Sequence, residues 1–296
     1  MLDFPGLGIF SKEFKMSEIL ITGAKGQLGT ELCHLLDERN IAYDAFDSSE
    51  LDITNELAVE KTFEEYQPKV VYHCAAYTAV DNAEDNGKAT NWFVNVNGTE
   101  NVAKAAQKVG AKMVYISTDY VFDGKNEHGY EVDDDLNPQN EYGRSKAAGE
   151  QAVQENLSDY YIIRTSWVFG EYGKNFVYTM LRLAKDHDKL TVVNDQFGRP
   201  TWTRTLAEFM VHLIDTDAEY GIYQLSNDGS CSWFEFATEI LKNKDVEVAP
   251  VTSAEFPQKA YRPTYSIMSL DKAKATGFEI PSWQEALGTF MRNIGE

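Results

Sequence analysis

The sequence is poor in cysteine and has no long apolar run. Its three cysteines, Cys33, Cys74 and Cys231, are isolated and show no C-x-x-C spacing, so neither a disulfide framework nor a zinc site is indicated. No apolar run approaches the roughly 20 residues that a helix needs to span a bilayer. We therefore expect a reduced, cytoplasmic protein with no membrane partner.

The first fifteen residues lack the basic start and continuous apolar stretch of a secretion signal. Met16 stands directly before the first strand-like segment. Residues 1–15 are thus read as a leader, an alternative start or an expression remnant, and they do not enter the fold prediction.

Basic residues are also scarce: 27 lysines and arginines face 47 acidic residues, which gives a formal charge of -20. This charge opposes binding to nucleic acid or to an anionic membrane surface. An anionic small ligand must therefore be held by local donors. A hydrophobic content of 43% over 296 residues is enough for a sizeable core, in one large or two modest domains.

The first half of the chain alternates short β-rich runs with helical stretches. This order, and apolar runs without alternation such as Val70-Val71-Tyr72, are typical of a parallel sheet covered on both faces. We predict an α/β fold with a doubly wound, Rossmann-like parallel sheet. The expected strands are 18–22, 42–46, 70–74 and 112–117, and the expected helices are 29–39, 57–66 and 91–109.

The pattern loosens after Gly170. A helix is expected around 176–185, strands at 190–193 and 221–225, and a helix at 233–241, which together suggest a smaller, mixed α/β cap. The predicted division is a dinucleotide-binding domain at 17–170 and a mainly substrate-binding domain at 171–296, with some segments returning to the first domain.

Glycines follow the first strand at the spacing of a dinucleotide-binding turn. Gly23 permits the tight turn, Gly26 lets backbone amides approach a pyrophosphate, and Gly29 lets helix and strand pack closely. A G-x-x-G-x-x-G string alone is weak evidence, but its place between the first strand and the first helix makes it specific. The predicted cofactor is NADPH or NADH.

The choice between the two cofactors stays open in the sequence. Asp47, at the end of the second strand, suits hydrogen bonds to the adenosine ribose and favours NADH. Lys25, in the glycine turn, suits a 2′-phosphate and favours NADPH. Ser48 and Ser49 accommodate either.

Three further segments are candidate cofactor contacts. Asp52 suits the adenine, or equally the cap of the following helix. Cys74-Ala75-Ala76-Tyr77 ends a strand, and its small residues leave room for a cofactor across the carboxyl ends of the strands. Ala75, Ala76 and Tyr77 are therefore predicted contacts, although the two alanines also suit a core.

The candidate catalytic group is Tyr142, Lys146 and Thr118. The phenol and the ammonium stand four positions apart, on one face of a helix. A free tyrosine has a pKa near 10, and a neighbouring cation favours its ionised form, so Lys146 is expected to lower the pKa of Tyr142 and to hold the ribose hydroxyls. Thr118 ends a strand, from which its hydroxyl is expected to donate to a substrate carbonyl.

At these residues the chain resembles the extended short-chain dehydrogenase/reductase family, and more closely its dTDP-4-dehydrorhamnose reductase branch. The resemblance runs from about Ser17 to the C-terminus. Beyond the glycine turn it rests on several strings in the order of that branch: AAYTAVD (75–81), STDYVFDG (117–124), RTSWVF (164–169), NDQFG (194–198), Pro200-Thr201 and Arg262-Pro263.

The resemblance implies further site residues. It implies that the backbone at Gln27 and Leu28 contacts the pyrophosphate and that Ser166 lies near the nicotinamide. The implied substrate-binding residues are Thr118, Asp119, Tyr120, Trp167, Asn175 and Arg262. Core packing is the alternative for Trp167, and a surface salt bridge is the alternative for Arg262.

One departure from the resemblance concerns metal. Some relatives are described as dimers bridged by a metal that two acids hold. Glu31 stands at the first acid position, but Arg204 stands at the second, and a cation cannot ligate magnesium. We expect no metal, and either a monomer or a homodimer.

The function that the resemblance implies is reduction of the C4 carbonyl of dTDP-4-dehydro-L-rhamnose to dTDP-L-rhamnose, with Tyr142 as proton donor. One alternative is a sugar-nucleotide 4,6-dehydratase, which Asp119 suits; Tyr120, where a dehydratase commonly has glutamate, favours reduction. The other is a non-catalytic regulatory subunit, against which the intact Thr118, Tyr142 and Lys146 argue.

Overall fold

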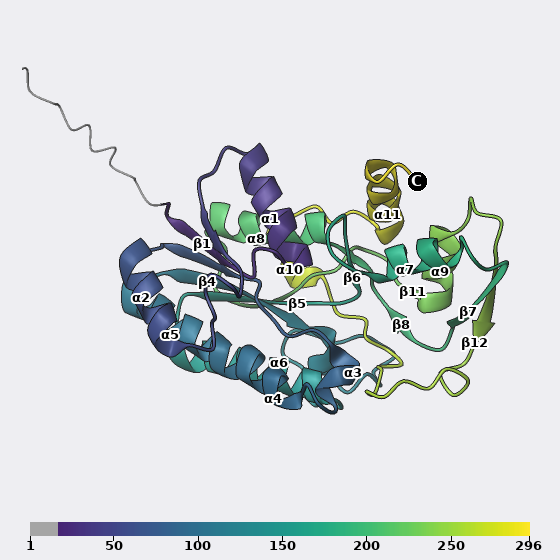
Figure 1. The fold of residues 1–296 in the computed structure, drawn as a ribbon, viewed down its shortest axis with the longest axis horizontal. Coiled ribbons are helices and arrows are strands. Elements are labelled where there is room, and N and C mark those ends of the chain that lie inside the picture. The colour runs from purple at the N-terminus through teal and green to yellow at the C-terminus, as the bar shows by residue number, and fades with distance from the viewer. Residues whose placement is uncertain (1–16) are drawn as a thin grey trace, which may run out of the picture.

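A computed structural model describes residues 17–296, so the expectations on residues 1–15 lie outside it. Its centre is a parallel sheet of six strands in the order β10-β5-β4-β3-β1-β2 (Figure 1). The predicted Rossmann-like sheet is confirmed. The strands are β1 (Ile19–Thr22), β2 (Asp44–Phe46), β3 (Val70–His73), β4 (Lys112–Thr118), β5 (Tyr160–Thr165) and β10 (Gly221–Gln224).

Helices cover both faces of this sheet, because its strands send alternate side chains into two cores. Ile21 and Tyr72 face the core of α1 (Gln27–Glu38) and α8 (Thr203–Asp215). Leu20 and Val71 face the core of α2, α5 and α6. The helices of the second core are α2 (Glu56–Tyr66), α5 (Thr99–Val109) and α6 (Glu141–Asn156). This explains the continuous apolar runs.

The mixed cap has a core of its own, built around Phe169, Phe236 and Phe290. It consists of short strand pairs and three helices, at the right of Figure 1. β7 pairs with β12 in parallel, and β8 pairs with β11 in antiparallel. The elements are α7 (Phe176–Leu183), β7 (Lys189–Val193), β8 (Phe197–Gly198), β11 (Cys231–Ser232), α9 (Trp233–Ile240), β12 (Glu247–Val251) and α11 (Trp283–Asn293).

Several later segments return to the main sheet. The pattern grouped the strand at 221–225 with the cap, which was wrong: β10 pairs with β5 at the edge of the main sheet. An apolar run shows that a strand is buried but not which sheet it joins. The remaining elements are β6 (Val168–Phe169), which pairs with β9 (Thr201–Trp202), and the short helix α10 (Asp271–Ala275).

The single helix expected at 91–109 is interrupted. Its place is taken by α4 (Lys88–Trp92), the π-helical η1 (Phe93–Gly98) and α5. A Cβ on Gly98 would lie 2.7 Å from the side chain of Ile53, so only glycine lets η1 approach that closely. The short α3 (Val80–Ala83) precedes α4, and the 3-10 turn η2 (Asp119–Val121) follows β4.

A buried ion pair joins β5 to α6, the helix that carries Tyr142 and Lys146. The Arg164 guanidinium donates to both carboxylate oxygens of Glu150, at 3.0 and 2.8 Å. The Ser117 hydroxyl also donates to Glu150. The two charged side chains are 2% and 1% exposed, so neither charge is hydrated. Their mutual pairing is therefore required for both to stay buried.

Within residues 17–296, no helix combines the length and the apolar character that crossing a bilayer requires. All three cysteines are free thiols.

Replacement of Glu150 by Gln should lower the free energy of unfolding by about 3–5 kcal/mol, because it leaves the Arg164 charge buried without a carboxylate. Chemical denaturation measures this change. The matched control is Glu247→Gln, since Glu247 pairs with Lys189 across β12 and β7 but both side chains are more than half exposed. The control should change by less than about 1 kcal/mol; equal losses would mean that burial of the pair is not what matters.

Candidate active site

The glycine turn between β1 and α1 presses closely against the end of β3. Gly23 has φ +70°, and a Cβ there would lie 2.6 Å from the backbone of Ala75. A Cβ on Gly29 would lie 2.2 Å from the carbonyl oxygen of Gly23. Both positions therefore require glycine. The turn and the end of β3 together form one continuous backbone surface.

The first amides of α1 have no hydrogen-bond partner among residues 17–296. Gly26 is the N-cap, it supplies no side-chain cap, and no acid stands in the first turn, which contains Gln27 and Leu28. Free backbone N–H groups and the positive end of the helix dipole attract an anion. These features fit the pyrophosphate of a dinucleotide, and the glycines leave the space it needs.

The two residues that pointed to different cofactors form an ion pair with each other. Lys25 Nζ contacts the carboxylate of Asp47. The backbone N–H and hydroxyl of Ser49 also donate to Asp47, at 2.8 and 2.7 Å. The Lys25 ammonium, and then the two Ser49 donors, hold the pKa of Asp47 well below its usual range. Asp47 is thus an ionised acceptor whose charge Lys25 partly neutralises.

Asp52 lies on the surface and forms a local turn. Its carboxylate accepts from the backbone N–H and hydroxyl of Thr54, at 2.9 and 2.8 Å. The alternative that it caps the next helix was wrong, because Asn55 is the N-cap of α2 and accepts from the Ala58 N–H. The carboxylate remains accessible, and its adenine contact stays a prediction.

The segment after β3 is held by a buried asparagine that the sequence analysis missed. Asn95 of η1 accepts from the Tyr77 N–H at 2.8 Å and donates to the Tyr77 carbonyl at 3.0 Å. It also donates to the Ser145 hydroxyl on α6 at 3.1 Å. Ala75 lies against Gly23, and Ala76 is exposed. The interrupted helix thus connects a predicted cofactor segment to the Tyr142 helix, and a π-helical turn leaves no recognised sequence signal.

Tyr142, Thr118 and Asp119 come together where β4 meets α6. The Thr118 hydroxyl donates to Asp119 at 2.9 Å and accepts from the Tyr120 N–H at 3.2 Å. Burial raises the pKa of the Asp119 carboxyl to about 6, and its second oxygen is buried without a hydrogen-bond partner. The Tyr142 ring packs edge-on against Tyr120, with 5.8 Å between ring centres. Asn140 starts this helix by accepting from the Gly143 N–H.

The pKa of Tyr142 moves opposite to the expected direction. Burial raises it well above its usual range, the negative charge of Asp119 raises it further, and the nearby Thr118 hydroxyl acts the other way. The net shift of this pKa is therefore the reverse of the expected one. The Lys146 ammonium lies over the ring of Tyr115, and its effect on the Tyr142 phenol stays a prediction. The phenol stays protonated at neutral pH.

Lys146 is buried, with 2% of the residue exposed. Its Nζ lies 4.1 Å from the centre of the Tyr115 ring. Burial lowers the pKa of Lys146 to about 7. An ammonium so weakly solvated gains more than usual from any new oxygen partner, such as a ribose hydroxyl.

The predicted residues of the cap junction are already engaged. Ser166 is 3% exposed, and its hydroxyl donates to the Arg199 carbonyl at 2.7 Å. Asn175 caps α7 and donates to the Gln27 side chain at 2.9 Å and to the Gly170 carbonyl at 2.8 Å. For Asn175 to contact a sugar, these bonds must exchange, so that role stays a prediction.

Trp167 stacks on Trp233, with ring centres 3.6 Å apart. A Cβ on Gly198 would lie 2.6 Å from the Trp167 ring, so Trp167 packs tightly between the two neighbours. Trp167 is thus half-buried and packed, and it does not line the cavity beside it; its contact with the sugar stays a prediction. Trp233, which the sequence analysis missed, lines that cavity instead.

This cavity, of about 330 Å³, lies between Tyr120 and the cap. Arg262 enters it: Nη2 pairs with Asp81 at 2.8 Å, whereas Nη1 is buried and has no hydrogen-bond partner in the described part of the chain. The predicted salt-bridge alternative is thus present, yet one edge of the guanidinium is left for a ligand. The lining residues are mostly aromatic, aliphatic or amide, with a thioether, a hydroxyl and the guanidinium besides: Tyr120, Phe176, Met180, Thr191, Val192, Val193, Gln196, Trp233, Phe256, Gln258 and Arg262.

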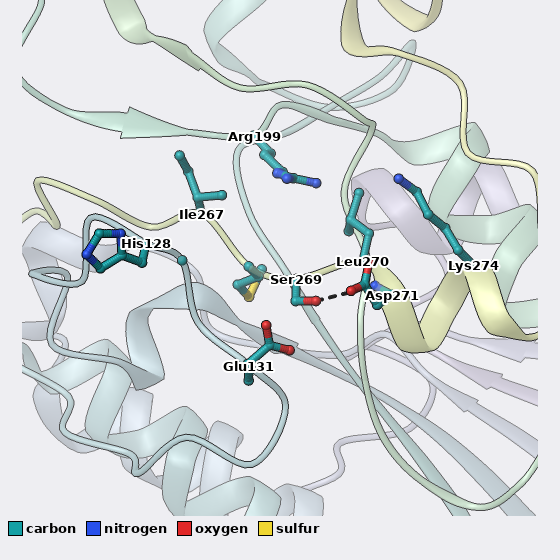
Figure 2. Close-up of a pocket in the computed structure, with 10 residues that line it drawn as sticks. His128, Glu131, Arg199, Ile267, Ser269, Leu270, Asp271 and Lys274 are labelled. Atoms are coloured by element: carbon teal, nitrogen blue, oxygen red, sulfur yellow. Dashed lines mark hydrogen bonds between the residues drawn. The ribbon is translucent and has the colours of Figure 1, made fainter.

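A second cavity, of about 190 Å³, lies around Arg199 and Lys274 (Figure 2). Glu131 and Asp271 also line it, and Asp228 pairs with Lys274 at 2.8 Å. None of the predicted catalytic or cofactor-binding residues lines this cavity. It therefore lies apart from the glycine turn and from Tyr142, Lys146 and Thr118.

Arg204 takes a central position among acids on α1 and α8. It pairs with Glu31 at 3.3 Å, with Glu208 at 3.0 Å, and with Glu38. Burial raises the pKa of Glu31, although Arg204 opposes this. Over residues 17–296, no cluster of His, Cys, Asp or Glu has the arrangement of a metal site. The Glu31 carboxylate, at the first acid position, thus pairs with the Arg204 guanidinium.

Known proteins resemble the chain over nearly its full length. The family model described as RmlD substrate binding domain matches residues 16–295. The spore coat polysaccharide biosynthesis protein SpsK of Bacillus subtilis is 41% identical, over 94% of this chain and 98% of that protein. The dTDP-4-dehydrorhamnose reductase of Streptomyces griseus is 42% identical, over 90% of this chain and 91% of its own length.

A solved structure has the same fold. It is the dTDP-4-dehydrorhamnose reductase of Bacillus anthracis in complex with NADP, which is 46% identical and superposes with a TM-score of 0.90 over 93% of this chain and 98% of the other. Since the family model and the full-length relatives agree, this chain belongs to the dTDP-4-dehydrorhamnose reductase family.

Proposed function

We propose that the chain reduces the C4 carbonyl of dTDP-4-dehydro-L-rhamnose to give dTDP-L-rhamnose, with NADPH or NADH as reductant. The observation that carries this proposal is the placement of the Tyr142 phenol beside the Thr118 hydroxyl, at the sheet edge that also holds the glycine turn. The family relationship to named reductases supports the same substrate. When bound, the reduced nicotinamide supplies a hydride to the carbonyl carbon.

The dinucleotide is assigned to the first 150 or so residues of the fold, from 17 to 170. The amides of Gln27 and Leu28 hold the pyrophosphate, and Asp47 faces the adenosine ribose. Ala75, Ala76 and Tyr77 flank the cofactor, and Ser166 lies at the nicotinamide end. The cap, mainly 171–296, holds the sugar nucleotide.

Tyr142 is the proton donor in this proposal. A tyrosine phenol has a pKa near 10 and burial raises that of Tyr142, so the phenol carries the proton that a donor needs at neutral pH. As the carbonyl oxygen gains negative charge, the phenol O–H transfers its proton to that oxygen. Thr118 orients the same oxygen, and Lys146 stabilises the phenolate that remains. In the structure the Thr118 hydroxyl donates to Asp119, so this hydrogen bond must exchange before Thr118 can donate to the carbonyl oxygen.

The cavity beside Tyr120 is assigned to the nucleotide part of the substrate. Its aromatic and aliphatic walls suit planar rings, and the two glutamines supply donors and acceptors. The unpartnered Nη1 of Arg262 supplies a charged donor to the diphosphate. Such local donors offset the repulsion between a doubly charged ligand and an acidic protein.

The setting follows from these assignments. A nucleotide-sugar reductase with free thiols suits the cytoplasm. The net charge of -20 opposes binding to nucleic acid or to an anionic membrane. The proposed oligomeric state is a monomer or a homodimer.

The direct test is turnover, followed by nicotinamide absorbance, with purified protein and dTDP-4-dehydro-L-rhamnose. Tyr142→Phe should lower turnover by at least about 100-fold, because it removes the general acid. Cofactor affinity should hardly change, since little binding surface is lost. Near-normal turnover of this variant would contradict the role of Tyr142 as proton donor.

Cofactor choice should depend on the Lys25–Asp47 pair. Asp47→Ala should weaken NADH binding by about tenfold, the effect of losing a charged hydrogen bond to the ribose. It should weaken NADPH less, because the freed Lys25 can meet the 2′-phosphate. Lys25→Met is the matched control and should affect NADPH more than NADH. Fluorescence titration measures the affinity of each variant for each cofactor. Equal losses for both cofactors would show that the Lys25–Asp47 pair does not select between them.

Arg262→Ala should raise the KM for the sugar nucleotide by about tenfold or more, because a charge-assisted hydrogen bond is lost. The KM for the cofactor should stay nearly constant. Lys259→Ala is the control: this lysine pairs with Asp85 and is half exposed, so its loss should have little effect. A larger effect at Lys259 than at Arg262 would show that the diphosphate is misplaced.

A further inference from the structure

Lys146 is a buried cation without a carboxylate of its own. Among residues 17–296, no acid forms an ion pair with its ammonium, and the nearest candidate on its helix face is Glu150. Both oxygens of Glu150 already accept from Arg164, and Ser117 donates to one of them. A buried charge needs some compensating partner.

The partner is the face of an aromatic ring. The centre of the Tyr115 ring lies 4.1 Å from Lys146 Nζ, and Tyr115 is fully buried. At this distance the negative face of the ring attracts a desolvated cation. The ring therefore occupies the place that a carboxylate takes in an ordinary buried pair.

The Tyr115 ring is held in place by its other neighbours. Tyr115 and His73 are cross-strand partners in β4 and β3, and their rings stack with 5.6 Å between centres. His73 contacts the hydroxyls of Thr22 at 2.6 Å and of Thr99 at 3.2 Å. Burial, and then the Lys146 charge, lower the pKa of His73 to about 3, so the imidazole stays neutral. Lysine, tyrosine and histidine thus contact one another in that order.

A glycine brings the helix close enough for this contact. A Cβ on Gly149 would lie 2.4 Å from the Tyr115 hydroxyl and 2.5 Å from the Asn95 carbonyl. Gly149 therefore lets α6 rest directly on the edge of the ring. Lys146, one turn earlier on the same helix face, then lies over the ring.

We propose that Tyr115 is the positioning residue of Lys146: its ring holds the ammonium at the sheet edge, ready for the ribose of the cofactor. The benefit to the cofactor rests on the proposed function, whereas the ring contact does not. A carboxylate in the place of the ring would hold the ammonium by a charged hydrogen bond that the ribose would have to replace. An aromatic face holds the same charge and leaves the N–H donors free.

The titratable groups around the ammonium are few. They are Tyr142 and Glu150 on its own helix, Tyr115 on β4, and His73 and Cys74 at the end of β3. Cys74 stays a thiol because burial raises its pKa. Lys146, with a lowered pKa of about 7, is therefore the group expected to titrate near neutrality. Loss of the ring should lower this pKa further, so the protonated form would be lost at a lower pH.

The experiment follows Lys146 directly in protein labelled with [ε-13C]lysine, with its resonance identified by its absence in Lys146→Met. The ring current of Tyr115 should shift this resonance away from the exposed lysines, and its titration should fall near neutral pH. Tyr115→Phe keeps a ring and should preserve both features; Tyr115→Leu should remove the ring shift and lower the titration midpoint.

NADPH titration of the same variants gives the second readout. Tyr115→Leu should weaken NADPH by about tenfold, within the range for losing a desolvated cation–π contact, whereas Tyr115→Phe should stay within about twofold of wild type. Tyr72→Leu is the matched control, because Tyr72 is equally buried in β3 but faces the opposite core.

The outcomes separate the two proposals. A Lys146 resonance without a ring shift in the wild-type protein overturns the positioning role, even if Tyr115→Leu does not fold. Equal effects in Tyr115→Leu and Tyr72→Leu overturn it as well. A normal ring shift in a protein that neither binds NADPH nor turns over leaves the contact standing and removes the proposed function.

Discussion

The candidate site depends on one constraint, that the strands of a parallel sheet all end at the same edge. Gly23 follows β1, Ala75 follows β3, Thr118 ends β4 and Ser166 follows β5. The chain thereby brings a backbone anion site, a hydroxyl and small cofactor-facing residues together from segments far apart in sequence. α6 then adds Tyr142 and Lys146, and its approach is set by the contact of Gly149 with Tyr115.

The sequence predicted the features that local rules determine. Glycines at fixed offsets identify the turn because only glycine tolerates the positive φ of Gly23 and the close contact of Gly29. The two-sided apolar strands identified the parallel sheet. The strand at 221–225 was assigned to the wrong sheet because pairing partners are nonlocal. Asn95 and Trp233 were missed because their contacts are made across the fold, with Tyr77 and with the cavity.

Electrostatics were harder to predict than positions. The spacing of Tyr142 and Lys146 suggested a cation beside a phenol, yet burial and Asp119 dominate the pKa of Tyr142, and the ammonium faces an aromatic ring. Helical spacing shows that two side chains share a face but not what lies beneath them. The buried Glu150–Arg164 pair explains why Lys146 faces a ring: Glu150 lies one turn from Lys146 on α6, but its carboxylate is already engaged by Arg164.

The central claim is that a hydride reaches C4 of the sugar while Tyr142 supplies the proton to oxygen. The most direct measurement is mass spectrometry of the sugar formed with NADPH that carries deuterium at the transferable C4 position of the nicotinamide. One deuterium at C4 of dTDP-L-rhamnose, and no solvent-derived label on carbon when the reaction runs in D2O, is the predicted result. A sugar without the C4 label, or one that takes up solvent deuterium at C5 as dehydratase chemistry requires, would contradict the claim.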